Sequence, residues 1–416
     1  MKQNAYVAGI GMTKFGKHMD RGLKSLTTEA ISQAITDSGL EAKDIEAAYM
    51  GNAAAGVIVG QVCVPGQVAL REIGISHIPV VNIENACASA STAFNQACTM
   101  ITSGLYDVVL ASGAEKLFHQ DKLKTFSVFT GAVDVENLAG VEQQIMQRAK
   151  NVGMEIDMGD AGAKRSIFMD IYASMALEHM SKYGTTQDQF AAVSAKNSYH
   201  GSLNPRAQYR EQLTLQQVLE SPEIVYPLTL PMCSPIGDGA AAVILVSEKK
   251  ARQMCLVQPV KVVSSVLRSG WDTEKNSDAS IAQVCAQEAY NEAGIGPHDL
   301  SCIELHDASA PSELIYYEHL GLCPEGEGGR FIDEGHSKLG GKVPVNTSGG
   351  LLRKGHPIGA TGIAQIVELT EQLQGRAQNR QVEGARIAMA ENGGGYINGD
   401  AAALVVSILT LDSKKG

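Results

Sequence analysis

The sequence predicts an α/β protein built from two copies of one structural unit, the first copy being interrupted by a long insert. The chain has 416 residues, which is too long for one small domain. Two observations predict the duplication. Similar segments recur along the chain, and each copy has the pattern of a helix, a glycine stop, a short turn and a buried strand.

The clearest repeat joins residues 30–50 to residues 285–305, at a constant shift of 255 positions (285 minus 30). The shift matches Gly39 with Gly294, and these glycines are expected to end the helix of each copy. The residues that follow each glycine predict a turn and then a strand. The chain therefore contains the same local unit twice.

Two further pairs extend the repeat and locate the insert. Residues 107–113 resemble 386–392 at a shift of 279, and residues 238–246 resemble 400–407 at a shift of 162. The shift falls by 117 positions (279 minus 162) between the two pairs. The first copy is therefore expected to carry an insert of about this length.

The repeat divides the chain into three parts. We expect an N-terminal half formed by residues 1–116 with 233–250, an inserted loop domain over 117–232, and a C-terminal half over 251–416. Within the insert, residues 168–182 have an amphipathic pattern that predicts a helix. An insert that follows a strand is a common place for substrate contacts, although it is also consistent with a lid or packing domain.

Composition excludes several classes of function. The net charge of −11, from 34 basic and 45 acidic residues, argues against a nucleic-acid surface or an anionic membrane face. The N-terminus has no signal-peptide pattern, and apolar runs such as 240–246 are far shorter than the ~18 residues of a membrane span. The eight cysteines form no C-x-x-C pair and no metal-binding cluster. We expect a cytoplasmic protein without a bound metal.

Cys87 is the candidate nucleophile. The run at 79–87 reads PVVNIENAC, an apolar segment that ends in polar residues, and small residues with helical spacing follow up to Gly104. This pattern places Cys87 at a strand-to-helix turn, where the helix dipole and free backbone N–H groups favour a thiolate. The alternative is an inert thiol in a tightly packed core.

His356 is the candidate base. It lies in a second glycine-rich turn, residues 346–362, which leads to a helix expected to begin near Ala360. His356 occupies the place in the second copy that Cys87 has in the first, so facing repeats would bring the two side chains together. The imidazole would then accept the thiol proton, and the thiolate would attack an acyl carbon. The alternative is a loop histidine that caps a helix or binds a carbonyl group.

These motifs together resemble the thiolase superfamily. The resemblance rests on N-x-x-N-A-C-A-S-A around Cys87, N-x-S-G-G-x(5)-H-P-I-G-A-T-G around His356, D-G-A-A-A at 238–242 and E-N-G-G-G at 391–395. The segment 303–326 is similar to the lipid-transfer (sterol carrier) branch. The resemblance covers essentially the whole chain and implies the duplicated, five-layered α-β-α-β-α thiolase fold, a tight homodimer and an acyl-cysteine intermediate.

The resemblance also assigns the remaining site residues. His306 and Asp307 match the pair that helps to form a first oxyanion hole. Gly394 matches the loop whose backbone N–H would form a second oxyanion hole with that of the nucleophile. Ser234 falls where the family contacts the pantetheine arm of coenzyme A. Coenzyme A is implied as co-substrate, with no covalently bound cofactor.

The sequence departs from the family at the second acid/base. Ordinary thiolases use the cysteine of a late C-x-G motif, where this chain has Glu391 and Asn392, and the lipid-transfer branch uses the cysteine of H-D-C-F, where this chain has Ala308. Glu391 could replace the cysteine if burial raised its pKa, whereas Asn392 could only orient water or stabilise an enolate. His306 is a further candidate. The alternative for Glu391 is a salt bridge at the dimer surface.

We therefore expect an acyl-CoA C-acyltransferase that works in the thiolytic direction. A weaker acid suffices for a well-stabilised enolate, which favours branched, aromatic or dicarboxylic 3-oxoacyl-CoA substrates, with benzoylsuccinyl-CoA as one candidate. The branch commonly pairs with a small zinc-bearing OB-fold protein, so such a partner is implied. The alternatives are a retro-aldolase of the steroid side-chain type and a non-catalytic lipid carrier or scaffold. The retained Cys87 and His356 argue against both.

Overall fold

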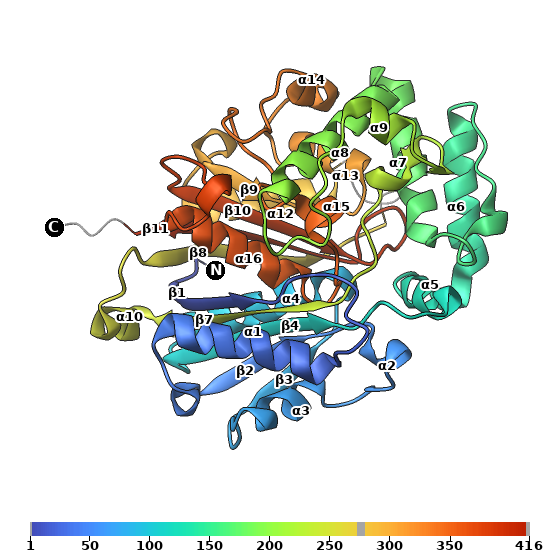
Figure 1. Cartoon of the computed structure of the whole chain (residues 1–416). Coiled ribbons are helices and arrows are strands. Elements are labelled where there is room, and N and C mark those ends of the chain that lie inside the picture. Colours follow the sequence, from blue (N-terminus) through green and yellow to red (C-terminus); the bar gives the residue numbers. More distant parts are fainter. Residues whose placement is uncertain (1, 273–278, 413–416) are drawn as a thin grey trace.

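The computed structural model describes residues 2–272 and 279–412, and its central feature is a long mixed β-sheet (Figure 1). Within the described residues the sheet has nine strands in the order β3-β2-β4-β7-β1-β8-β11-β10-β9, and β5 and β6 form a separate pair. The strands are β1 (Ala5–Met12), β2 (Ala47–Gly51), β3 (Val80–Ile83), β4 (Val108–Glu115), β5 (Glu223–Val225), β6 (Leu228–Thr229), β7 (Gly239–Ser247), β8 (Val260–Ser269), β9 (Cys302–Glu304), β10 (Ile387–Gly394) and β11 (Ala403–Leu411).

The sheet consists of two similar halves. In one half β7 is antiparallel to β1 and β4, and β2 is parallel to β4. In the other half β11 is antiparallel to β8 and β10, and β9 is parallel to β10. The halves join where β1 pairs with β8, from Ala5 opposite Val262 to Val7 opposite Val260. The predicted duplication of an α/β unit is confirmed.

The helices complete five layers. Helix α1 (Leu23–Ser38) covers β1 and β7 on the outer side of one half, and α12 (Ile281–Ala293) covers β8 and β11 on the outer side of the other. Between the halves, α4 (Ser89–Thr102) and α16 (Thr361–Leu373) pack on each other, and their apolar side chains share one buried cluster with strands of both halves. The five-layered thiolase architecture is confirmed.

The remaining helices belong mainly to the insert and to the C-terminal half. They are α2 (Ala55–Ile58), α3 (Pro65–Glu72), α5 (Lys122–Thr130), α6 (Leu138–Asn151), α7 (Ile167–Tyr183), α8 (Gln187–Ser202), α9 (Leu215–Leu219), α10 (Glu248–Met254), α13 (Ala310–His319), α14 (Gly328–Asp333) and α15 (Gly350–Lys354). Among the described residues, no helix combines the length and apolar character needed to cross a membrane.

Local structure follows the repeat closely. Gly39 ends α1 with φ of 70° and Gly294 ends α12 with φ of 73°, a left-handed conformation that glycine adopts without a steric penalty. In both copies a short turn and a strand follow, as predicted. The helix predicted over 168–182 is α7, and the helix predicted near Ala360 is α16. Helices α5 to α9 all fall within the expected insert.

Candidate active site

A strained turn presents Cys87. Strand β3 ends at Ile83, a 3₁₀ turn spans Ala86–Ala88, and α4 begins immediately afterwards. Ala86 has φ of 48°, a left-handed conformation that is uncommon outside glycine and costs free energy. Strand β10 passes beside the turn at Gly394, where a Cβ atom would lie 2.2 Å from the Asn85 carbonyl oxygen. Only glycine therefore allows this close approach.

Cys87 and His356 form a hydrogen-bonded pair. The Cys87 Sγ and the His356 Nε2 are 3.3 Å apart, and the His356 Nδ1 lies 2.8 Å from the Thr361 Oγ1. The Thr361 hydroxyl donates to the Pro357 carbonyl oxygen, so it accepts a hydrogen bond from the imidazole Nδ1–H. This chain of hydrogen bonds leaves Nε2 as an acceptor that faces the thiol.

Burial keeps both members of this pair neutral in the unliganded protein. Burial raises the pKa of Cys87 to about 12. Burial also lowers the pKa of His356 well below its usual range, as does the neighbouring His306. The helix N-terminus was expected to stabilise a Cys87 thiolate, but the desolvation of the buried thiol has the larger effect on its pKa. A Cys87 thiolate would therefore form only if the thiol proton moved to the His356 Nε2, which lies 3.3 Å away.

His306 completes a group of three side chains. It follows β9, and its ring centroid lies 5.1 Å from that of His356 in an edge-to-face arrangement. One ligand-type atom from each of Cys87, His306 and His356 lies within 4.8 Å of the others. The His306 Nε2 is buried without a hydrogen-bond partner, and burial lowers the His306 pKa to about 4. A neutral imidazole here could donate a hydrogen bond to an oxyanion or a water molecule.

Glu391 is buried and does not form the surface salt bridge that was considered. Its side chain is 0% exposed, and one carboxylate oxygen accepts the backbone N–H of His306 at 2.9 Å. The other oxygen, Oε1, has no partner, and no ion pair involves Glu391 within the described residues. Burial raises its pKa to about 8, so the carboxyl is mainly protonated at neutral pH.

Asn392 faces the other side of β10. Its Oδ1 accepts a hydrogen bond from the Ser91 hydroxyl at 2.8 Å, and its Nδ2 is buried without a partner. Successive side chains of a strand point to opposite faces, so Glu391 and Asn392 cannot both approach His306. Neither side chain lies on the wall of the two cavities that reach Cys87.

Asp307 is not brought together with the other candidate residues. Its carboxylate accepts the backbone N–H of Leu351 at 2.7 Å and the side-chain amide of Asn197 at 2.8 Å. The side chain is fully buried and absent from both cavity walls. Asp307 therefore fixes the start of α15, which leads to His356, and does not face the substrate space.

Glu115 is a site residue that the sequence did not reveal. This fully buried carboxylate accepts the backbone N–H groups of Ala53, Ala54 and Gly359, and the side-chain amide of Asn52. It thereby joins the loop after β2 to the loop that follows His356. Burial raises its pKa to about 8. A lone glutamate at the end of a strand gives no sequence signal for such a role.

Two cavities meet at Cys87. The first, of about 650 Å³, contains Cys87, His356 and Ser234, and its lining also includes Lys17 and Lys122. Both lysines are exposed and have no carboxylate partner within the described residues. Cations that are not neutralised by a carboxylate can bind the phosphate groups of a ligand, so this cavity suits a phosphate-bearing ligand.

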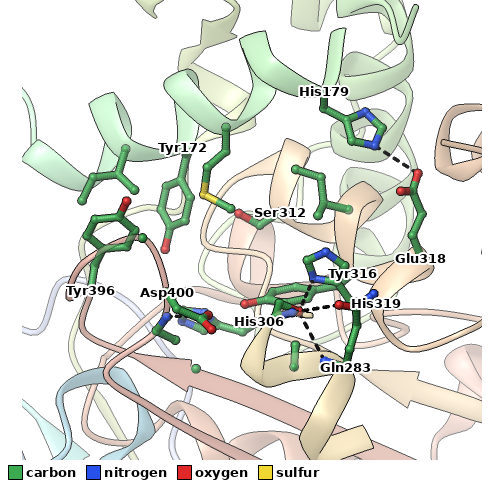
Figure 2. A pocket seen from close by; sticks show the side chains of 18 of the residues that line it. Tyr172, His179, Gln283, His306, Ser312, Tyr316, Glu318, His319, Tyr396 and Asp400 are labelled. Carbon is green, nitrogen blue, oxygen red and sulfur yellow. Dashed lines mark hydrogen bonds and ion pairs between the residues drawn. The ribbon is translucent and has the colours of Figure 1, made fainter. Parts of the chain in front are cut away.

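The second cavity, of about 550 Å³, lies between the insert and the C-terminal half (Figure 2). It shares Cys87, Phe168 and Tyr172 with the first cavity. Its other walls are rich in polar and aromatic side chains: His179, Gln283, His306, Ser312, Tyr316, His319, Tyr396 and Asp400. Gly394 also lines this cavity, so the predicted oxyanion strand reaches it.

Comparisons with known proteins agree with this geometry. The family model of the thiolase N-terminal domain matches residues 5–213, and a model described as thiolase C-terminal domain-like matches residues 270–407. The chain is 38% identical to an acetyl-CoA acetyltransferase of Methanothermobacter thermautotrophicus, over 94% of this chain and 96% of the relative. It is 33% identical to the benzoylsuccinyl-CoA thiolase subunit BbsB of Thauera aromatica, over 95% and 96%.

Two further similarities concern the lipid-transfer branch and the fold. Sterol carrier protein 2 of Gallus gallus is 35% identical, over 94% of this chain and 70% of the relative. The solved structure titled Ltp2-ChsH2(DUF35) aldolase has a TM-score of 0.76 at 24% identity, with 99% of this chain and 98% of that chain covered. The chain belongs to the thiolase superfamily, in its lipid-transfer branch. It is a thiolase-type acyltransferase.

Proposed function

We propose that the protein cleaves a 3-oxoacyl-CoA with free coenzyme A through an acyl-Cys87 intermediate. The observation that carries the proposal is the Cys87–His356 pair, with its 3.3 Å contact, at the junction of two cavities. The cavity that contains Ser234, Lys17 and Lys122 would hold coenzyme A, its phosphates near the lysines. The other cavity would hold the acyl group.

The first half-reaction follows from the hydrogen bonds. The His356 Nε2 accepts the Cys87 proton, and the thiolate attacks the C3 carbonyl carbon of the substrate. The charge that develops on the carbonyl oxygen would be stabilised by donors at this point, of which the His306 imidazole and the backbone N–H groups of Cys87 and Gly394 are the candidates. The C2–C3 bond then breaks, which leaves the acyl group on sulfur and an acyl-CoA enolate.

The enolate carbon must take a proton, and we assign Glu391 as its source. The carboxyl is protonated near neutral pH because burial raises its pKa to about 8. Its unpartnered Oε1 is fully buried and off the cavity wall, so a bound water molecule or His306 would have to relay the proton to the enolate. His306, which lies on the cavity wall, is the next candidate. In the second half-reaction the Glu391 carboxylate takes back a proton from the thiol of coenzyme A, whose sulfur attacks the acyl-Cys87 thioester. The Cys87 sulfur leaves and recovers its proton from the protonated His356.

The acyl group is proposed to be larger than acetyl. A cavity of about 550 Å³ beyond Cys87 far exceeds the volume of a methyl group. Branched, aromatic and dicarboxylic acyl groups all fit this size. The printed name of the Thauera aromatica relative makes benzoylsuccinyl-CoA one member of the set.

We further propose that the protein forms a homodimer through β3. This strand is at the end of the sheet order, and its Val81 side chain is 43% exposed. The adjoining segment exposes further valines: Val57, Val59, Val62, Val64 and Val68. An apolar edge strand without a partner favours pairing with a second copy of the same strand. A stable monomer of 44.0 kDa in light scattering would refute the proposal.

A small zinc-bearing OB-fold protein is the proposed second partner. Two comparisons support it: the Thauera aromatica relative is named as a subunit, and the similar solved structure is titled as an aldolase of Ltp2 with ChsH2(DUF35). That structure also raises a retro-aldolase as the second candidate function. The intact pair of Cys87 and His356 favours the thiolase, because a retro-aldol cleavage requires no thiol nucleophile.

Product analysis tests the proposed function. Wild-type protein is mixed with 3-oxo-3-phenylpropanoyl-CoA, with and without free coenzyme A. A thiolase turns over to benzoyl-CoA and acetyl-CoA only when coenzyme A is present; without it, no benzoyl-CoA forms and acetyl-CoA is released in at most one equivalent per active site. A retro-aldolase is tested in parallel with a 3-hydroxyacyl-CoA, from which it releases a free aldehyde or ketone. Release of that product without any thiolysis would overturn the proposal, and no product in either assay would favour a carrier or scaffold.

A further inference from the structure

Two tyrosines of the second cavity have hydroxyl groups without protein partners. Tyr172 belongs to α7 of the insert and Tyr316 to α13 of the C-terminal half, and both line the cavity. Figure 2 shows Tyr172 reaching from its helix into the space that Tyr316 borders from below. Neither hydroxyl forms a hydrogen bond within the described residues, although both side chains are half-buried. Each phenol faces the cavity with a donor that no described residue uses, so it is available to an acceptor on a bound ligand.

The two hydroxyls lie close to the reacting centre. Tyr172 lines both cavities together with Cys87, and the Tyr316 hydroxyl oxygen lies 3.6 Å from the position that a Cβ of Gly393 would occupy. Burial raises the pKa of both tyrosines. Both phenols therefore remain O–H donors at any physiological pH.

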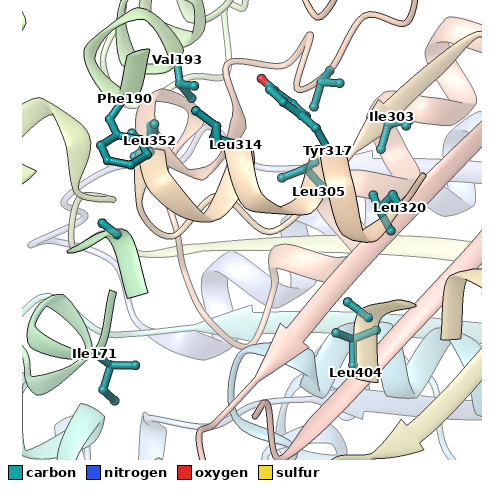
Figure 3. Close-up of a cluster of buried hydrophobic side chains, with 14 of the residues drawn as sticks. Ile171, Phe190, Val193, Ile303, Leu305, Leu314, Tyr317, Leu320, Leu352 and Leu404 are labelled. Carbon is teal, nitrogen blue, oxygen red and sulfur yellow. The ribbon is translucent and has the colours of Figure 1, made fainter. Parts of the chain in front are cut away.

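The helices that carry these tyrosines are fixed by packing. Ile171 precedes Tyr172, and Leu314 and Tyr317 flank Tyr316; all three belong to one buried apolar cluster that joins the insert to the C-terminal half (Figure 3). The Tyr316 ring also contacts His319 at 5.8 Å, edge to face. The donors are thus held on rigid elements, as a selective binding site requires.

The charged side chains of the cavity disfavour a substrate carboxylate. Within the described lining, both side chains with a fixed positive charge are already paired: Arg148 with Glu178 at 3.2 Å, and Lys182 with Glu325 at 3.0 Å. His179 contacts Glu318, and Asp400 adds a further carboxyl group. The walls therefore offer aromatic faces and neutral donors. Four carboxyl groups stand in this lining against two cations, so a substrate carboxylate meets no excess of positive charge there.

We propose that this cavity selects acyl groups that are ring-sized, uncharged and equipped with a hydrogen-bond-accepting oxygen, which Tyr172 and Tyr316 bind. An acyl group attached to Cys87 enters the cavity past Tyr172, because that residue stands at the junction. The inference rests on the proposed thiolase function. It narrows the substrate set from branched, aromatic or dicarboxylic groups to oxygenated aromatic or alicyclic ones.

Three thioesters test the inference: 3-oxo-3-(4-methoxyphenyl)propanoyl-CoA, 3-oxo-3-phenylpropanoyl-CoA and 3-oxoadipyl-CoA. They present an uncharged ring oxygen, a plain ring and a carboxylate. We expect wild-type kcat/KM for the methoxyphenyl compound to exceed that for the phenyl compound roughly three- to tenfold, the factor of one hydrogen bond. The 3-oxoadipyl compound is expected to be the poorest substrate.

Single substitutions assign the preference to the phenols. Tyr172→Phe and Tyr316→Phe should each bring the methoxyphenyl-to-phenyl ratio towards one, whereas the matched control Tyr199→Phe, an exposed tyrosine of α8, should retain it. The inference is overturned if the ratio is unchanged in both cavity variants. It is also overturned if kcat/KM falls equally for both substrates, because the phenols would then act in the reaction itself. A preference for the 3-oxoadipyl compound also overturns it.

A binding measurement separates this inference from the proposed function. Dissociation constants of the same three compounds, measured by calorimetry in the Cys87→Ala background, report the preference of the cavity without turnover. If wild-type protein cleaves none of the compounds, the proposed thiolysis fails. The inference about the cavity then stands if the methoxyphenyl compound binds tightest and the preference falls on Tyr172→Phe or Tyr316→Phe. It fails if the binding constants show no such order.

Discussion

Replacement of Thr361 by valine should slow the acylation of Cys87 without changing the groups that react. Thr361 accepts the Nδ1–H of His356 at 2.8 Å and is 0% exposed, so no bulk water replaces the lost hydroxyl. An unpaired buried donor costs about 1–3 kcal/mol. Part of this cost can be avoided by the other tautomer, but that tautomer has a proton on Nε2 and cannot accept one from Cys87.

At about 1.4 kcal/mol per factor of ten, this cost predicts a roughly 5- to 150-fold slower acylation. Rapid-quench mixing with a 3-oxoacyl-CoA, followed by counting of the acylated protein, measures the step directly. The matched control is Thr370→Val on the same helix, because the Thr370 hydroxyl is buried and has no partner among the residues that the structure describes. Equal acylation rates in Thr361→Val and wild type would refute the reasoning about the tautomer.

Four further substitutions test the rest of the site. Cys87→Ala should retain less than about a hundredth of the wild-type turnover with an unchanged melting temperature, while Cys323→Ala, outside both cavities, should retain activity. Glu391→Gln should slow C–C cleavage and leave Cys87 acylation by a simple acyl-CoA nearly unchanged, whereas Asn392→Ala should slow both steps if the amide supports an oxyanion site. In wild type, cleavage should fall as pH rises through about 8, because the active form of Glu391 is the protonated one; a flat profile there would exclude it. Gly394→Ala should cost activity and thermal stability together, because the new Cβ would lie 2.2 Å from a backbone oxygen.

The fold was predictable because its information is local and repeated. The two helix–glycine–turn–strand units recur with the same spacing, and Gly39 and Gly294 end their helices in the same conformation. The same symmetry predicted that Cys87 and His356 would meet, although 269 positions separate them in the chain. Because the chain is duplicated, a sequence pattern was sufficient to predict a contact between distant residues.

The features of the site that could not be predicted from the sequence depend on the direction in which side chains point and on the exclusion of solvent. Asp307 follows His306 directly, yet it points to the opposite side and binds the backbone at Leu351. Burial raises the pKa of Cys87, whereas a helix dipole would lower it. The sequence does not reveal which of the two effects is larger. Tyr172 and Tyr316 lie on ordinary amphipathic helices, where their spacing indicates a core position.

The acyl-Cys87 intermediate is the central claim, and trapping it is the most direct test. Wild-type protein is mixed with a 3-oxoacyl-CoA in the absence of free coenzyme A, quenched in acid and digested, and the peptide that contains Cys87 is weighed by mass spectrometry. The proposed mechanism predicts one acyl group on Cys87 and one equivalent of the shortened acyl-CoA released. Cleavage of the substrate with an unmodified Cys87 peptide would contradict it.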